Sequence, residues 1–159
     1  MSLAVCRIYT GDTFGAFHPR LDVSETSTNQ KPLRILMAED NAINQRVGKL
    51  ILQRAGFQVD LVADGSEAVA AHENQPYDVI LMDCQMPTMD GFEASRKIRE
   101  LDRKQPVIIA VTANALVGER EKCLEAGMND YLSKPFQAEQ LVGVVKKWAA
   151  GRDDSAPPE

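Results

Sequence analysis

Compact apolar runs alternate with helix-periodic segments five times between residues 33 and 150 of this 159-residue chain. Such runs, bounded by charged or turn-forming residues, are typical of buried strands. The predicted strands are Leu33–Ala38, Phe57–Val62, Val79–Met82, Val107–Val111 and Tyr131–Ser133. Because each strand leads into a helix through a short connection, the strands are expected to run parallel with right-handed crossovers. The chain is therefore predicted to be an α/β protein with a doubly wound, five-stranded parallel sheet and helices on both faces.

Apolar residues at helical spacing follow each predicted strand. In the first helix, Ile43, Val47, Leu50 and Ile51 share one face, and Gly56 stands where a glycine commonly ends a helix. The other helices are marked by Ser66–Asn74, by Ala94, Ile98 and Leu101, by Leu116, Cys123 and Leu124, and by Ala138, Leu141, Val142, Val145 and Trp148.

The two ends of the chain lack this pattern. Residues 22–32 are polar and end in proline, and residues 151–159 are rich in charge and proline. Both compositions are typical of linkers. We therefore expect a linker or flexible segment over residues 1–32, a folded domain over 33–150 and a flexible tail over 151–159.

Charge and composition exclude several classes of function. The net charge of −5 argues against broad contact with nucleic acid or with a membrane surface. No apolar run approaches the roughly 18 residues that a membrane span needs. The three cysteines show no CxxC spacing, which argues against a zinc site or a disulfide framework and favours a reducing compartment.

The polar residues of interest stand at the carboxyl ends of the predicted strands. Glu39 and Asp40 follow the first strand, Asp83 the third, Thr112 the fourth and Lys134 the fifth. In an open α/β sheet, ligands bind at this edge, near the point where the strand order reverses. If the order is 2-1-3-4-5, the three carboxylates converge there and the hydroxyl and the lysine face them.

This set of groups favours phosphoryl transfer. Three neighbouring carboxylates repel one another, and hard oxygen ligands with open positions are what Mg²⁺ takes, together with waters and a substrate phosphate. Lys134 can pair with one phosphoryl oxygen as a point charge, and the Thr112 hydroxyl can donate to another. A carboxylate can act as the nucleophile and form an aspartyl phosphate. Positioning and charge neutralisation supply most of the catalysis that such a transfer requires.

Four motifs, taken together and in order, resemble those of response-regulator receiver domains over residues 33 to about 150. The motifs are Met37–Asn41, Leu81–Gly91, Val111–Asn114 and Tyr131–Phe136. The resemblance implies a flavodoxin-like receiver fold and a place in a two-component phosphorelay. The opening Glu39–Asn41, followed by Asn44 and Gln45, is most similar to receivers of hybrid sensor histidine kinases.

The resemblance implies a role for each site residue. Asp83 would be the phosphoacceptor, Asp40 a direct ligand of Mg²⁺ (with Mn²⁺ as an alternative) and Glu39 a ligand mainly through water. The backbone carbonyl of Gln85 would be a further metal ligand. The domain would catalyse its own phosphorylation at Asp83, and the hydrolysis of the product, as part of a hybrid histidine kinase chain.

The remaining motif residues would read out the phosphoryl group. By resemblance, Thr112 and Lys134 contact it, and Tyr131 is the aromatic residue that reports the switched state. The implied donor is a histidine kinase or a histidine phosphotransfer protein. The signal would leave through the face formed by the fourth helix, the strand Tyr131–Ser133 and the fifth helix, where self-association is one expected outcome. The expected location is cytoplasmic, including the cytosolic part of a membrane-bound sensor kinase.

Two alternative functions remain open. A degenerate receiver would serve as a binding module without phosphorylation, but such a module needs none of Asp40, Asp83, Thr112 and Lys134. A phosphatase of the haloacid-dehalogenase type also uses an aspartyl nucleophile, but it requires a second aspartate two residues later, where Gln85 stands.

Three expectations concern single residues near these motifs. The Lys134–Pro135 peptide bond should be cis, because a tight turn must direct Lys134 into the site and cis costs only ~0.5–1 kcal/mol before proline. His72 should lie on the polar side of its helix, in solvent. Cys84 has no evident His or Cys partner, so it is not expected to be a reactive thiol.

Overall fold

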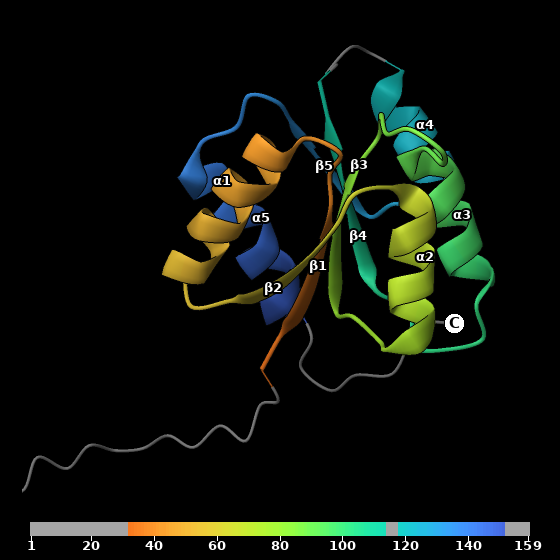
Figure 1. Ribbon diagram of the computed structural model, residues 1–159, viewed down its shortest axis with the longest axis horizontal. Coiled ribbons are helices and arrows are strands. Elements are labelled where there is room, and N and C mark those ends of the chain that lie inside the picture. Colours follow the sequence, from red (N-terminus) through yellow and green to blue (C-terminus); the bar gives the residue numbers. More distant parts are fainter. Residues whose placement is uncertain (1–31, 114–117, 152–159) are drawn as a thin grey trace, which may run out of the picture. The chain divides into compact units, whose positions relative to one another are not determined.

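The computed structural model describes residues 32–113 and 118–151, which belong to one compact unit, Lys31–Glu159. Its elements follow the predicted alternation (Figure 1). They are β1 (Arg34–Ala38), α1 (Ala42–Arg54), β2 (Gln58–Val62), α2 (Gly65–Asn74), β3 (Val79–Asp83), α3 (Gly91–Glu100), β4 (Val107–Thr112), α4 (Glu119–Glu125), β5 (Asp130–Ser133) and α5 (Ala138–Ala150). The expected linker and tail lie outside the described residues, apart from Pro32 and Gly151, as do Asn114 and Leu116. The predicted domain boundaries therefore stay predictions.

The sheet has the predicted order, β2-β1-β3-β4-β5, and all of its strand pairs are parallel. β1 pairs with β2 on one side and with β3 on the other, so the strand order reverses between β1 and β3. Every residue of β3 is buried, as expected for a central strand with helices on both faces. β2 forms one edge and exposes Asp60.

Two apolar cores lie on the two faces of the sheet. Helices α1 and α5 cover one face, and α2, α3 and α4 cover the other (Figure 1). Leu52, Leu141 and Val145 anchor the first pair of helices. Ala68, Ile98 and Cys123 anchor the other three. Within the described residues, no helix is both long and apolar enough to cross a membrane.

The apolar face predicted for α1 is largely exposed to solvent. Ile43, Val47 and Leu50 are 74%, 48% and 47% exposed, although they share one side of the helix. The buried residues of α1 are Gly48 and Leu52. The helical period was correct, and Ile51 packs against the core, but the other three residues of the stripe lie on an exposed side of α1.

The prediction that His72 lies in solvent was wrong. His72 stands in the last turn of α2 and is fully buried. Its Nδ1 accepts a hydrogen bond from the backbone N–H of Tyr77 at 3.2 Å, and Arg103 donates to its carbonyl at 2.9 Å. The segment that leads into β3 therefore folds over the imidazole. Helical spacing alone could not reveal that contact.

Acid should destabilise the fold through His72. Burial lowers the pKa of the imidazole below 6.5. A hydrogen bond with the backbone of Lys104 favours the cation, but burial outweighs it, and the charges of Arg103 and Arg99 lower the pKa further. As the pH falls below the ordinary pKa, the unfolded chain takes up the proton before the folded chain does, so the free energy of unfolding decreases. Urea denaturation at about pH 7.5 and about pH 5 should detect this loss, and His72→Gln should reduce it. An unchanged pH dependence in His72→Gln would contradict the assignment.

Candidate functional site

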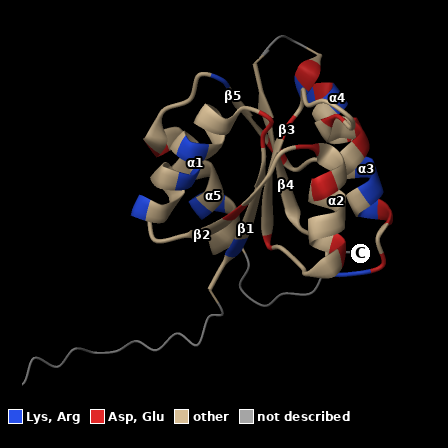
Figure 2. Ribbon diagram, viewed as in Figure 1, with Lys and Arg blue, Asp and Glu red and all other residues tan. Residues whose placement is uncertain are grey.

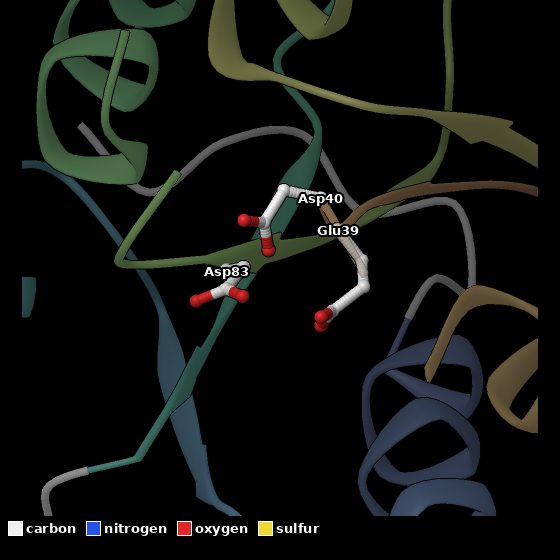
Figure 3. Close-up of side chains that lie close together, drawn as sticks. All are labelled: Glu39, Asp40 and Asp83. Atoms are coloured by element: carbon white, nitrogen blue, oxygen red, sulfur yellow. The ribbon is translucent and has the colours of Figure 1, made fainter. Parts of the chain in front are cut away.

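Three carboxylates meet where β1 and β3 end. Ala38 lies opposite Met82 in the parallel register, so the residues that follow them, Glu39 and Asp83, stand at the same edge of the sheet. Oxygen atoms of Glu39, Asp40 and Asp83 lie within 4.8 Å of one another (Figure 3). Acidic residues line this edge, while lysine and arginine residues are spread over α1 and α3 (Figure 2).

Lys134 compensates two of these charges. Glu39 and Asp83 are 1% and 4% exposed, whereas Asp40 faces solvent. The Nζ of Lys134 donates to Glu39 Oε2 and to Asp83 Oδ2, at 2.7 Å in each case. A buried charge without a partner is strongly unfavourable, so one ammonium shared by two carboxylates holds the cluster together.

The pKa values in the cluster reflect burial and pairing. Burial raises the pKa of Asp83 above its usual value of 3.8, because it outweighs the hydrogen bonds from Lys134 and from the backbone of Gln85. Burial by itself would lower the pKa of Lys134, but the hydrogen bonds to Asp83 and Glu39 outweigh it and raise the pKa. The lysine therefore stays charged, while the carboxylate of Asp83 is held in an unfavourable environment.

The ends of β4 and β5 bring Thr112 and Lys134 to this edge. Thr112 is the last residue of β4 and is 3% exposed. Its carbonyl accepts a hydrogen bond from the backbone N–H of Lys134 at 2.7 Å. The Lys134–Pro135 peptide bond is cis, which confirms the prediction.

The loop between β3 and α3 holds Asp83 from the other side. The backbone N–H of Gln85 donates to Asp83 Oδ1 at 2.9 Å. The N–H of Cys84 donates to the carbonyl of Val111 at 2.9 Å, and the N–H of Gly91 donates to the carbonyl of Cys84 at 3.2 Å. These bonds tie the end of β3 to β4 and to the start of α3.

Two amide side chains that were not assigned to the site contact Glu39. Asn44 Nδ2 donates to Glu39 Oε1 at 2.8 Å. Gln45 Nε2 donates to the backbone carbonyl of Glu39 at 2.7 Å and to that of Val62 at 3.2 Å. The available signal was the position of two amides in the first turn of a helix that begins beside the acidic pair.

Tyr131 and Cys84 differ from the other motif residues. Tyr131 lies on β5, is 40% exposed and pairs in register with Ala110. The expectation that Cys84 lacks a cysteine partner was wrong, because its thiol contacts that of Cys123. Both cysteines are buried and reduced, and burial raises the pKa of both thiols. Such thiols are poor nucleophiles, in line with the expected lack of reactivity.

A hollow of about 430 Å³ opens beside Lys134. It is lined by Asn44, Val47, Ala113, Lys134, Pro135 and Phe136. The hollow thus lies between α1 and the segment that joins β5 to α5, next to the buried carboxylates.

Comparison with known proteins gives a consistent result. The sequence model of the response regulator receiver domain matches residues 35–146. Hybrid signal transduction histidine kinase B of Dictyostelium discoideum is 40% identical over 132 residues, which cover 75% of this chain and 7% of that protein. The chain thus spans less than a tenth of that relative.

Two solved structures are similar over about three quarters of the chain. One is the receiver domain of sensor histidine kinase PA1611 from Pseudomonas aeruginosa PAO1, with a magnesium ion coordinated in the active site cleft. It is 49% identical, with a TM-score of 0.70, and the match covers 76% of this chain and 99% of that chain. The other is a chain from the co-crystal structure of the Saccharomyces cerevisiae histidine phosphotransfer signaling protein Ypd1 and the receiver domain of its downstream response regulator Ssk1. It is 29% identical, with a TM-score of 0.70, over 75% of this chain and 90% of that chain.

Proposed function

This chain belongs to the response regulator receiver domain family, and from that premise we propose that Asp83 accepts a phosphoryl group from a phosphohistidine donor. The chain is a receiver domain of two-component signalling. The observation that carries the proposal is the buried cluster in which Lys134 bonds to both Glu39 and Asp83. An ammonium between an acceptor and its neighbour is well placed to receive phosphoryl oxygens.

The proposed transfer makes one bond and breaks one. A carboxylate oxygen of Asp83 attacks phosphorus, the P–O bond forms as the P–N bond to the donor imidazole breaks, and the imidazole leaves with its electron pair and takes a proton from solvent. Lys134 neutralises charge on the phosphoryl group, and Thr112 is proposed to donate its hydroxyl to a second oxygen. Hydrolysis by water would later return the carboxylate.

The donor atoms at the edge of the sheet fit a divalent cation. Glu39, Asp40 and Asp83 offer hard oxygen ligands within 4.8 Å of one another, and exposed Asp40 leaves room for water. We propose that these residues and the backbone carbonyl of Gln85 hold Mg²⁺, with Mn²⁺ as a substitute. The bound ion would supply charge neutralisation for the phosphoryl oxygens. The magnesium ion in the similar receiver of PA1611 supports this choice.

Removal of the cation should stop phosphorylation. Acetyl phosphate with millimolar Mg²⁺ should add one phosphoryl group to the protein, because positioning and charge neutralisation suffice for this transfer. Excess EDTA should abolish the added mass in intact-mass spectrometry, and Mn²⁺ added after the chelator should restore it. Labelling that persists in EDTA would show that the proposed metal requirement is wrong.

We propose that Thr112 and Tyr131 form the switch. A new hydrogen bond from the Thr112 hydroxyl to a charged phosphoryl oxygen is worth roughly 1–3 kcal/mol. As Thr112 moves toward the phosphoryl group, it would leave space into which Tyr131 can turn. The energy of the new bond is enough to shift a two-state equilibrium by about 5–150-fold. Beryllofluoride should therefore change amide NMR shifts along β5 as well as at the metal site, and Thr112→Ala should remove the distant changes. Shifts confined to the metal site in the unmodified protein would refute the switch.

The proposed partners follow from the chemistry of the donor. A histidine kinase or a histidine phosphotransfer protein carries the required phosphoimidazole, and we propose that this group approaches from the side of the hollow beside Lys134. The complex of Ypd1 with the Ssk1 receiver supports this class of partner. A phosphotransfer screen against candidate kinases would identify the donor. We propose that the chain acts as the cytoplasmic receiver of a hybrid kinase.

The output is proposed to use the face formed by α4, β5 and α5. Leu124 and Tyr131 are 49% and 40% exposed there, so they are available to a second copy of the chain or to another protein. Sedimentation equilibrium with and without beryllofluoride would test self-association. A degenerate receiver is disfavoured, because Asp40, Asp83 and Lys134 are kept together at one edge.

A further inference from the structure

Glu39 has two hydrogen-bond donors of different kinds. The ammonium of Lys134 lies 2.7 Å from Oε2, and the side-chain amide of Asn44 lies 2.8 Å from Oε1. The side chain of Glu39 is only 2% exposed. A carboxylate this deeply buried depends on such partners in place of water. The two donors therefore determine where the Glu39 carboxylate points.

The bond from Lys134 is shared. The same ammonium lies 2.7 Å from Asp83 Oδ2. On the proposed function, a phosphoryl group at Asp83 brings additional charged oxygens that compete for Lys134. The bond from Asn44 to Glu39 does not depend on that competition, so it can hold Glu39 while Lys134 changes partners.

The first turn of α1 places Asn44, an exposed residue, beside Glu39. Asn41 caps the helix, and its Oδ1 accepts from the backbone N–H groups of Ile43 at 2.9 Å and Asn44 at 3.3 Å. Gln45 donates to the backbone carbonyl of Glu39 at 2.7 Å. The start of α1 therefore holds both the main chain and the carboxylate of Glu39.

We infer that Asn44 is a positioning residue, which keeps the Glu39 carboxylate directed at the cation site while Lys134 moves between the carboxylates and the phosphoryl group. The inference rests on the proposed function and adds to it a residue that sets cation affinity without touching the cation. Removal of a group that orients a metal ligand typically weakens metal binding about 10–100-fold.

The test measures Mn²⁺ binding directly, by electron paramagnetic resonance of the free ion. Asn44→Ala should raise the Kd for Mn²⁺ about tenfold, since Glu39 loses its fixed donor. Ile43→Ala is the matched control, because Ile43 is the neighbouring residue in the same turn and is 74% exposed. Its Kd should equal that of the unmodified protein. Circular dichroism checks that α1 stays folded, and Asn44→Leu provides a second variant that keeps the branched shape but has no donor.

A double-mutant cycle separates positioning from a structural effect. If Asn44 acts through Glu39, Asn44→Ala should cause no further loss of Mn²⁺ affinity in a Glu39→Ala background. The inference is overturned if Asn44→Ala binds Mn²⁺ like the unmodified protein, or if it has the same effect in both backgrounds. Failure of the proposed function would differ, because the unmodified protein itself would then bind no Mn²⁺ or gain no phosphoryl group at Asp83.

Discussion

Asp83→Asn should abolish phosphorylation by acetyl phosphate while leaving the fold intact. The amide has the shape of the carboxylate but lacks the nucleophilic oxygen anion that forms the acyl phosphate. Lys134 keeps its second partner, because it also bonds to Glu39 at 2.7 Å. The expected result in intact-mass spectrometry is complete loss of the added phosphoryl mass.

The same substitution should make the metal-free protein more stable. The pKa of Asp83 is raised, chiefly by burial, so at neutral pH the folded state carries a carboxylate in an unfavourable environment. A group with a raised carboxyl pKa opposes folding when it is ionised, and a neutral amide removes that cost. Urea denaturation in EDTA should therefore give a higher midpoint for Asp83→Asn than for the unmodified protein.

Asp90→Asn is the matched control for both measurements. Asp90 belongs to the same loop and caps α3 by accepting from the N–H of Glu93 at 2.8 Å. Asparagine caps helices as well as aspartate does, so stability and labelling should both be retained. Full labelling of Asp83→Asn, or loss of labelling in Asp90→Asn alone, would place the acceptor elsewhere.

Gly91→Ala should lower the stability of the fold and displace Asp83, the proposed acceptor. A Cβ at Gly91 would clash with the carbonyl oxygen of Asp83 and would lie 2.9 Å from Cγ of Met82. A backbone oxygen cannot rotate away as a flexible side chain can, so α3 or the end of β3 must shift. Overpacking of this kind typically costs about 1–3 kcal/mol in free energy of unfolding. Displacement of Asp83 should also slow phosphorylation by roughly tenfold to a hundredfold.

Gly143→Ala makes the same chemical change where there is space. Gly143 lies within α5, and a Cβ there would meet no atom within 4 Å. Alanine favours a helix over glycine by about 0.5–1 kcal/mol, so this variant should be slightly more stable and should be labelled normally. The comparison needs urea denaturation and time courses with acetyl phosphate for both variants. Equal stability of the two variants would contradict the close packing at Gly91.

Local patterns were sufficient to predict most of the fold. Val79–Met82 is so apolar that it had to be a central strand, and the parallel order followed from short strand–helix connections. The placement of Glu39, Asp83 and Lys134 at one edge followed from the same topology, since Asp83 ends a strand and the other two directly follow one. Strand ends are specified by neighbours in the sequence, so they can be recognised without coordinates.

Helix faces were less predictable, because burial depends on what packs against a helix. The spacing of Ile43, Val47 and Leu50 predicted one side of α1 correctly but could not tell whether the sheet covers that side. His72 carries a polar ring, yet it is buried where Tyr77 and Arg103 close over the end of α2. These contacts join residues from separate elements.

The sequence by itself determined which residues end the strands, and therefore the chemical groups of the candidate site. Only the tertiary structure decided how those groups share their partners. Lys134 bonds to Glu39 and Asp83 together, and Asn44 bonds to the other oxygen of Glu39. The reason is geometric, since a hydrogen bond requires donor and acceptor within about 3 Å in a suitable direction. Sequence spacing specifies a residue's place along its own element, whereas the packing of α1 and β5 around β1 sets the distances between elements.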